Sequence, residues 1–122
     1  MAKILIIEDV EAAQDSIRRT LEINGYEVMV APNGKIGLCK IEQDAPDVVI
    51  TDIFMPEMEG LETIQKIVKS RPNLPIIVMT GFIGTPFLQA ALKFGASYGL
   101  YKPFQEHELL DTLNNALNNV EK

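Results

Sequence analysis

Reactive side chains follow four apolar runs of the chain, at the point where each run ends. The run "KILIIE" ends at Glu8 with Asp9 next, "DVVIT" leads into Asp52, "PIIVMT" ends at Thr80, and "GLYK" ends at Lys102. Burying an unpaired carboxylate costs several kcal/mol in practice. An acid placed where the chain leaves the core, such as Asp52, therefore either caps a turn or belongs to a site.

These residue types have a shared chemistry if they meet. Three carboxylates in one crevice repel one another unless a cation joins them, and oxygen ligands with open positions suit Mg²⁺. An aspartate can act as a nucleophile and form an aspartyl phosphate. A metal ion, the Lys102 ammonium and the Thr80 hydroxyl would then stabilise the transferred phosphoryl group.

The elements that carry these residues follow a regular order. The runs 3–8, 27–31, 47–51, 75–80 and 99–102 predict strands, and continuous apolar runs are typical of strands covered on both faces. Helical patterns fill the gaps. Their apolar positions are Ala13, Ile17 and Leu21; Ile36, Cys39 and Ile41; Leu61, Ile64, Ile67 and Val68; Leu88, Ala91 and Leu92; and Leu109, Leu110, Leu113, Leu117 and Val120.

Strand followed by helix, five times, predicts one doubly wound α/β domain with a five-stranded parallel sheet and helices on both faces. Asn24-Gly25 and Gly95 are expected to stop the first and fourth helices, and Thr85-Pro86 to begin the fourth. Ligands of such sheets bind beyond the carboxyl ends of the strands. The reactive side chains are all expected at that edge, which makes a separate plain role for each of them improbable.

Composition limits the function further. The net charge is −6 and the pI about 4.7, which argues against direct binding to nucleic acid or to anionic membranes. The chain shows neither a signal peptide nor a stretch of transmembrane length. The single Cys39 is expected to be a small buried apolar residue, and a cytoplasmic location is expected.

The sequence resembles the receiver domain of bacterial two-component response regulators. The resemblance covers residues 1–122 as one domain. The motifs that show it are "ILIIEDV", "DVVITDIFMPEMEG", "PIIVMTG" and "GASYGLYKPF". It implies a flavodoxin-like fold with strand order 2-1-3-4-5. It also implies a phosphorelay protein that catalyses its own phosphorylation and dephosphorylation and is not a turnover enzyme.

The resemblance assigns roles to the reactive residues. Asp52 is the implied phospho-acceptor, Lys102 and Thr80 its catalytic partners, and Asp9 and Glu8 the acids that hold Mg²⁺, directly and through water respectively. The backbone carbonyl of Phe54 is a further implied ligand. A cis bond is implied between Lys102 and Pro103, and the site is flanked by Met55, Gly81, Phe82 and Pro103.

The implied phosphodonor is a sensor histidine kinase or a histidine phosphotransfer protein. The implied output partner, or a homodimer formed on phosphorylation, uses the face of the fourth helix, fifth strand and fifth helix. The switch aromatic of the family would fall at Gly99, which has no side chain to rotate, so Tyr101 is the better candidate for partner contact. Phe54 and Phe82 are expected to shield the aspartyl phosphate from water and prolong its life.

Three other functions would use some of the same residues. A haloacid dehalogenase-type phosphatase needs a second Asp where this chain has Phe54, and a flavodoxin-like FMN module needs a phosphate-binding loop where this chain has the acidic segment 8–11. A pseudo-receiver that only binds partners is disfavoured by the complete set of site residues. Labelling by acetyl phosphate in the presence of Mg²⁺ would separate it from a working receiver.

Overall fold

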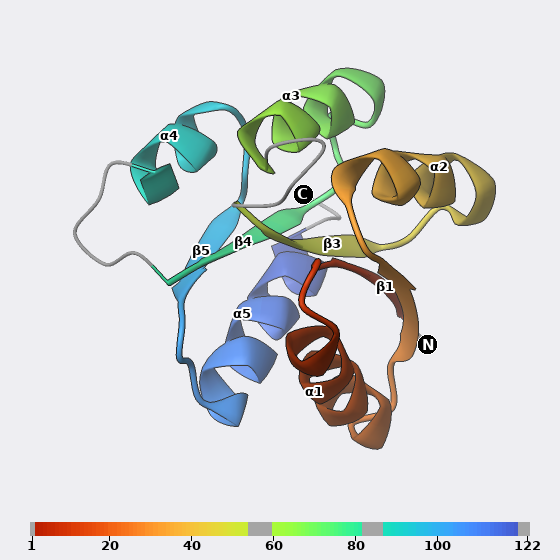
Figure 1. Ribbon diagram of the computed structural model, residues 1–122, viewed down its shortest axis with the longest axis vertical. Helices are drawn as coiled ribbons and strands as arrows, with labels where there is room; N and C mark the ends of the chain where they lie inside the picture. Colours follow the sequence, from red (N-terminus) through yellow and green to blue (C-terminus); the bar gives the residue numbers. More distant parts are fainter. Residues whose placement is uncertain (1, 54–59, 82–86, 120–122) are drawn as a thin grey trace.

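The predicted strands form one parallel sheet. The computed structural model describes residues 2–53, 60–81 and 87–119, and within them the strands are β1 Lys3–Ile7, β2 Glu27–Ala31, β3 Val48–Asp52, β4 Ile76–Thr80 and β5 Tyr98–Tyr101. Their spatial order is β2-β1-β3-β4-β5, as the resemblance implied (Figure 1). Every residue of β3 and β4 is buried, which fits the continuous apolar runs that predicted them.

Helices cover both faces of this sheet. Helices α1 Glu11–Ile23 and α5 Glu106–Asn119 lie on one face, and α2 Gly34–Asp44, α3 Gly60–Ser70 and α4 Phe87–Lys93 lie on the other (Figure 1). Helix α1 ends just before Asn24-Gly25 and α4 ends shortly before Gly95, and both glycines have positive φ. These two predicted stops are confirmed, whereas Thr85-Pro86 lies outside the described residues.

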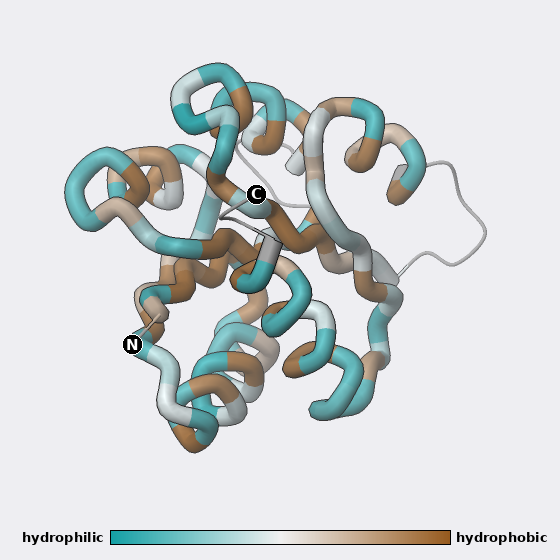
Figure 2. The backbone as a smooth tube through the Cα atoms, turned by 180° about the vertical axis from the view of Figure 1, so that it is seen from behind, coloured by the Kyte–Doolittle hydropathy of each residue, from teal (hydrophilic) through white to brown (hydrophobic). Residues whose placement is uncertain are grey.

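Two apolar cores result from the alternation of side chains along the strands. Ile4 and Ile6 of β1 pack with Ile17 and Leu21 of α1 and with α5, while Leu5 and Ile7 point to the opposite core under α2, α3 and α4. Figure 2 shows hydrophobic residues gathered in the central sheet and hydrophilic residues on the outer turns of the helices. The sheet is therefore the shared wall between two separate cores.

The prediction that Cys39 is buried is wrong, because its side chain is exposed. Helix α2 buries Gly34, Gly37 and Ile41. A Cβ built on Gly37 would lie 2.5 Å from Ile7 Cδ1, so the helix approaches the sheet closely along this glycine. Cys39 is two residues from both Gly37 and Ile41, roughly 200° around the helix, and so points outward.

Leu92 is one of the apolar positions that predicted this helix, and an inward orientation follows from that pattern, but its side chain is 37% exposed. Among the residues of α4 from Leu88 onward, Leu88 and Ala91 are buried. Leu92 follows Ala91 by roughly 100° around the axis, which turns it toward the edge of the helix. In a helix of only seven residues, the inward stripe is too short for its edges to be located from periodicity alone.

Leu88 lies directly over Gly99 of β5. A Cβ at position 99 would collide with Leu88 Cδ1 and would lie 3.0 Å from both Cγ and Cδ2 of the same side chain. Gly99 is paired with Val78 in the middle of the β4–β5 ladder. The glycine at the position of the family's aromatic thus allows α4 to pack close to the last strand.

Candidate functional site

The alternation of side chains explains which strand-end residues meet. Glu8 continues the series Ile4 and Ile6, and Asp52 continues the series Val48 and Ile50, all of which face the α1–α5 side of the sheet. Lys102 comes two residues after Leu100, which belongs to the same core. β1 and β3 are neighbours, so their two acids lie next to each other at the carboxyl edge.

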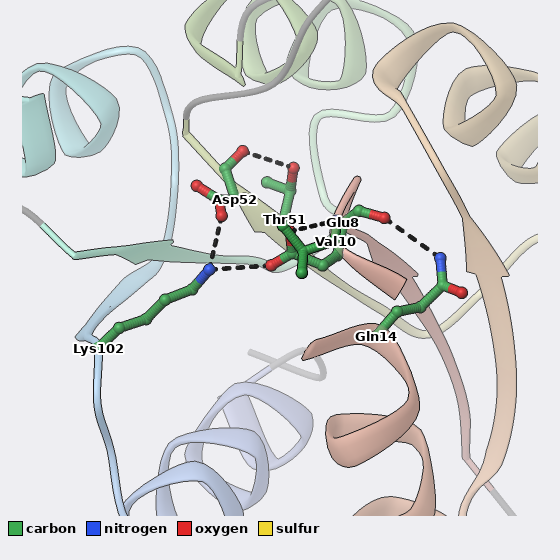
Figure 3. A network of polar contacts seen from close by, with 6 residues as sticks. All are labelled: Glu8, Val10, Gln14, Thr51, Asp52 and Lys102. Atoms are coloured by element: carbon green, nitrogen blue, oxygen red, sulfur yellow. Dashed lines mark hydrogen bonds and ion pairs between the residues drawn. The ribbon is translucent and has the colours of Figure 1, made fainter. Parts of the chain in front are cut away.

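Lys102 joins these two acids. Its Nζ donates to Glu8 Oε1 at 2.9 Å and to Asp52 Oδ2 at 2.6 Å (Figure 3). Burial alone would lower the pKa of the Lys102 ammonium, but its hydrogen bonds to Asp52 and Glu8 outweigh burial and hold that pKa above its ordinary value. Lys102 is therefore a fixed positive charge between two carboxylates.

Glu8 is the most deeply placed of the acids, with no exposed surface. Burial raises the pKa of Glu8, while the hydrogen bonds from Lys102 and from the backbone N–H of Val10 act in the opposite direction. The Val10 N–H donates to Glu8 Oε2 at 3.1 Å. Both oxygens of this buried carboxylate thus have donors, which is the condition for keeping an acid inside a protein.

Asp9 completes a three-acid cluster. One carboxylate oxygen from each of Glu8, Asp9 and Asp52 lies within 4.8 Å of the others. Glu8 and Asp52 are buried and Asp9 is exposed, so the cluster opens to solvent on the Asp9 side. Hard oxygen donors with one open side fit a divalent cation such as Mg²⁺, which retains some of its waters.

The predicted ligand Phe54 and the flanking residues Met55 and Phe82 lie outside the described residues.

The remaining predicted residues also lie at this edge. Thr80 is the fully buried last residue of β4, and its carbonyl accepts a hydrogen bond of 2.7 Å from the Lys102 backbone N–H. Gly81 is exposed, and a Cβ built on it would have no neighbour within 4 Å. The Lys102–Pro103 peptide bond is cis, as expected. By alternation Thr80 belongs with Val78 on the α4 side of the sheet, opposite to the acids.

Gln14 was not predicted as part of the site. Its side-chain amide donates to the backbone carbonyl of Glu8 at 3.2 Å (Figure 3). The same amide donates to the backbone carbonyl of Ala31 at 3.5 Å. A signal was present in the sequence, because Gln14 lies three residues before Ile17 and seven before Leu21, on the buried stripe of α1. A polar residue on such a stripe requires a partner in the interior.

A family model for the response regulator receiver domain matches residues 4–114. The chain belongs to the response regulator receiver family. Receivers are signalling domains and not turnover enzymes, so the phosphatase and FMN-module alternatives are set aside.

Known relatives support this assignment. The receiver is 39% identical over 108 residues to the response regulator MprA of Mycolicibacterium vanbaalenii, a match that covers 88% of this chain and 47% of that protein. The chain thus spans about half the length of the curated relatives it matches.

Solved structures agree on the fold. A response regulator receiver domain protein from Clostridium thermocellum superimposes with a TM-score of 0.94 at 35% identity, over 99% of this chain and 98% of that one. The chemotaxis protein CheY4 of Vibrio cholerae gives 0.91 at 33% identity, over 96% and 99% of the two chains. Among the described residues of the receiver, none of the helices has both the length and the apolar content to cross a membrane.

Proposed function

We propose that residues 1–122 act as one receiver domain that accepts a phosphoryl group on Asp52 and thereby controls an output partner. The observation that carries the proposal is the position of Lys102 Nζ, within hydrogen-bond distance of both Asp52 and Glu8. Asp9 lies beside them at the open side of the three-acid cluster. A nucleophilic carboxylate, a fixed cation and a metal-binding acid pair are the parts that phosphoryl transfer to an aspartate requires.

In the proposed reaction, an Asp52 carboxylate oxygen attacks the phosphorus of a phosphohistidine. The new O–P bond forms as the P–N bond breaks, and the imidazole leaves with the electron pair of that bond. Glu8, Asp9 and Asp52 would hold Mg²⁺, which supplies positive charge to the phosphoryl oxygens when bound. Lys102 keeps its proton throughout, because its pKa is held above the ordinary value, and places a second positive charge beside the acceptor.

A groove beside Lys102 supports docking of the phosphodonor. A hollow of about 490 Å³ is lined mostly by apolar surface from Ala13 and Ile17 of α1 and from Pro103 and Phe104. A smaller hollow continues along Ile17 and Phe104 to Leu109 of α5. An apolar helix face of a histidine kinase or phosphotransfer protein would fit this groove and bring its phosphohistidine close to Lys102 and Asp52.

The output surface is proposed on the face of α4, β5 and α5. Tyr101 is 37% exposed and lies in register with Thr80, and Leu92 and Phe94 add exposed apolar surface at the end of α4. The partner is a target protein, an output domain or a second phosphorylated copy. A cytoplasmic location is proposed, and neither nucleic acid nor a membrane is expected to bind this acidic domain directly.

The test is labelling with acetyl phosphate and Mg²⁺, followed by intact-mass spectrometry under mild conditions. The wild type should gain one phosphoryl group, and Asp52→Asn should gain none while keeping its circular dichroism spectrum. Asp111→Asn, an exposed aspartate of α5, is the matched control and should label normally. An unlabelled wild type would favour the pseudo-receiver alternative, and a labelled Asp52→Asn would refute the assignment of the acceptor.

A further inference from the structure

Gln14 connects three elements at the edge of the site. Its backbone N–H donates to the Val10 carbonyl at 3.0 Å in the first turn of α1. Its side-chain amide donates to the carbonyl of Glu8, just beyond β1, and to the carbonyl of Ala31, the last residue of β2. The Ala31 carbonyl also accepts the Glu8 backbone N–H at 3.0 Å. The start of the helix and the ends of two strands are therefore linked through one side chain.

The Glu8 carbonyl has a particular place in the metal-binding segment. It belongs to the peptide unit between Glu8 and Asp9, the two neighbouring acids of the cluster. A peptide unit is planar, so fixing its carbonyl oxygen fixes the rotation of the whole unit. That rotation sets the directions in which both acid side chains leave the backbone. A single hydrogen bond from Gln14 can thus orient two ligands at once.

The buried and exposed sides of the cluster differ in how they are held. The Glu8 carboxylate is fixed directly by Lys102 and Val10. Asp9 is exposed and follows the end of β1, so its backbone has no strand partner on that side. The Gln14 bond holds the carbonyl on the N-terminal side of Asp9, and the bond from the Val10 N–H to Glu8 Oε2 holds the peptide unit on its C-terminal side. Asp9 depends more on Gln14 than Glu8 does, because both oxygens of the Glu8 carboxylate already accept hydrogen bonds.

We propose that Gln14 is a positioning residue for divalent metal: it holds the Glu8–Asp9 peptide unit so that both carboxylates face the cation. This inference rests on the proposed function, since it concerns the same metal site. Groups that orient metal ligands without touching the metal commonly change metal affinity by about 10- to 100-fold when removed. One neutral hydrogen bond to the backbone should lie at or below that range, so we expect about a 3- to 10-fold loss.

The experiment compares Gln14→Met with the wild type. Methionine keeps the length and the helix propensity of glutamine but cannot donate a hydrogen bond. Gln65→Met, an exposed glutamine of α3, is the matched control. Magnesium affinity is measured by calorimetric titration of the metal alone, and the unfolding free energy in urea is measured without metal. Initial rates of acetyl phosphate labelling are then recorded across a range of Mg²⁺ concentrations.

If Gln14 positions the metal ligands, Gln14→Met should bind Mg²⁺ about 3- to 10-fold more weakly than the wild type. Its labelling rate should return to the wild-type plateau at saturating Mg²⁺. Gln65→Met should behave as the wild type in both measurements. Loss of stability with unchanged Mg²⁺ affinity would mean that Gln14 only holds the fold, and would overturn the inference. If Gln14→Met does not fold, Gln14→Asn, which keeps the amide on a shorter stem, should show the same weakening. A wild type that binds no Mg²⁺ would instead refute the proposed metal site itself.

Discussion

Adding one methyl group at position 99 should reveal how α4 is held against the sheet. In Gly99→Ala the new Cβ would collide with Leu88 Cδ1 and crowd the rest of that side chain. Overfilling a packed site typically costs about 1–3 kcal/mol. Replacing glycine by alanine returns about 0.4–1 kcal/mol by restricting the unfolded chain. The free energy of unfolding should therefore fall by about 1.3 kcal/mol, the midpoint of a range of about 0–2.6 kcal/mol.

Leu88→Ala removes the side chain with which a Cβ at position 99 would collide. Truncating a buried leucine costs about 2–5 kcal/mol, and Leu88, at 7% exposure near the edge of the sheet, should fall near the lower end. In the double variant the methyl at 99 occupies part of the space left by Leu88. The double variant should thus be more stable than the sum of the single effects predicts, by about 1–2 kcal/mol.

Urea unfolding followed by circular dichroism measures all three variants. Gly81→Ala is the matched control, because its Cβ would enter open space, and it should be as stable as the wild type or more stable by up to about 1 kcal/mol. The reasoning is refuted if Gly99→Ala is as harmless as Gly81→Ala. Strict additivity of the two single substitutions would refute it equally.

Three further predictions concern the site and its partners. Because the pKa of Glu8 is raised above its ordinary 4.5, the folded protein binds this proton more tightly than the unfolded chain does. The metal-free wild type should therefore lose stability relative to Glu8→Gln as the pH rises from 4.5 through the raised pKa. Urea unfolding measures this difference in stability, and a difference that does not change with pH would contradict the prediction. Tyr101→Ala should weaken binding of the phosphorylated domain to its output partner by about 1 kcal/mol or more, measured by calorimetry. Unchanged affinity would mean that Tyr101 only covers β5 and does not contact the partner. Phe54→Asn and Phe82→Glu should each release phosphate about tenfold faster or more than the wild type, measured as decay of the labelled form, and no acceleration in either would defeat the shielding prediction.

The order of strands and helices could be predicted because it depends on patterns that repeat along the chain. Continuous apolar runs indicated buried strands, and the reactive residues at their ends marked one edge of the sheet. Which of these residues meet follows from the period of two, since Glu8 and Asp52 continue the series that faces α1 and α5. The same rule places Thr80 on the opposite side.

Contacts that depend on distance across the fold could not be predicted in this way. The exposure of Cys39 and Leu92 depends on where α2 and α4 touch the sheet, which is set by close packing at Gly37 and by Leu88 over Gly99. The role of Gln14 depends on the reach of a side chain to carbonyls of two strands. A sequence pattern gives the face of a helix on which a residue lies, and not the backbone atom that the residue reaches.

The proposed donor groove and the α4–β5 part of the proposed output surface lie on opposite faces of the sheet, while α5 borders both. The proposed donor groove is built from α1, Pro103 and Phe104 on one side, whereas Leu88, Gly99 and Tyr101 belong to the other side. Substitutions that alter which kinase is recognised can accumulate on the first side without entering the packing of the second. We expect that exchanging the surface of α1 would change which donor this receiver accepts and would leave the packing of α4 on β5 unchanged.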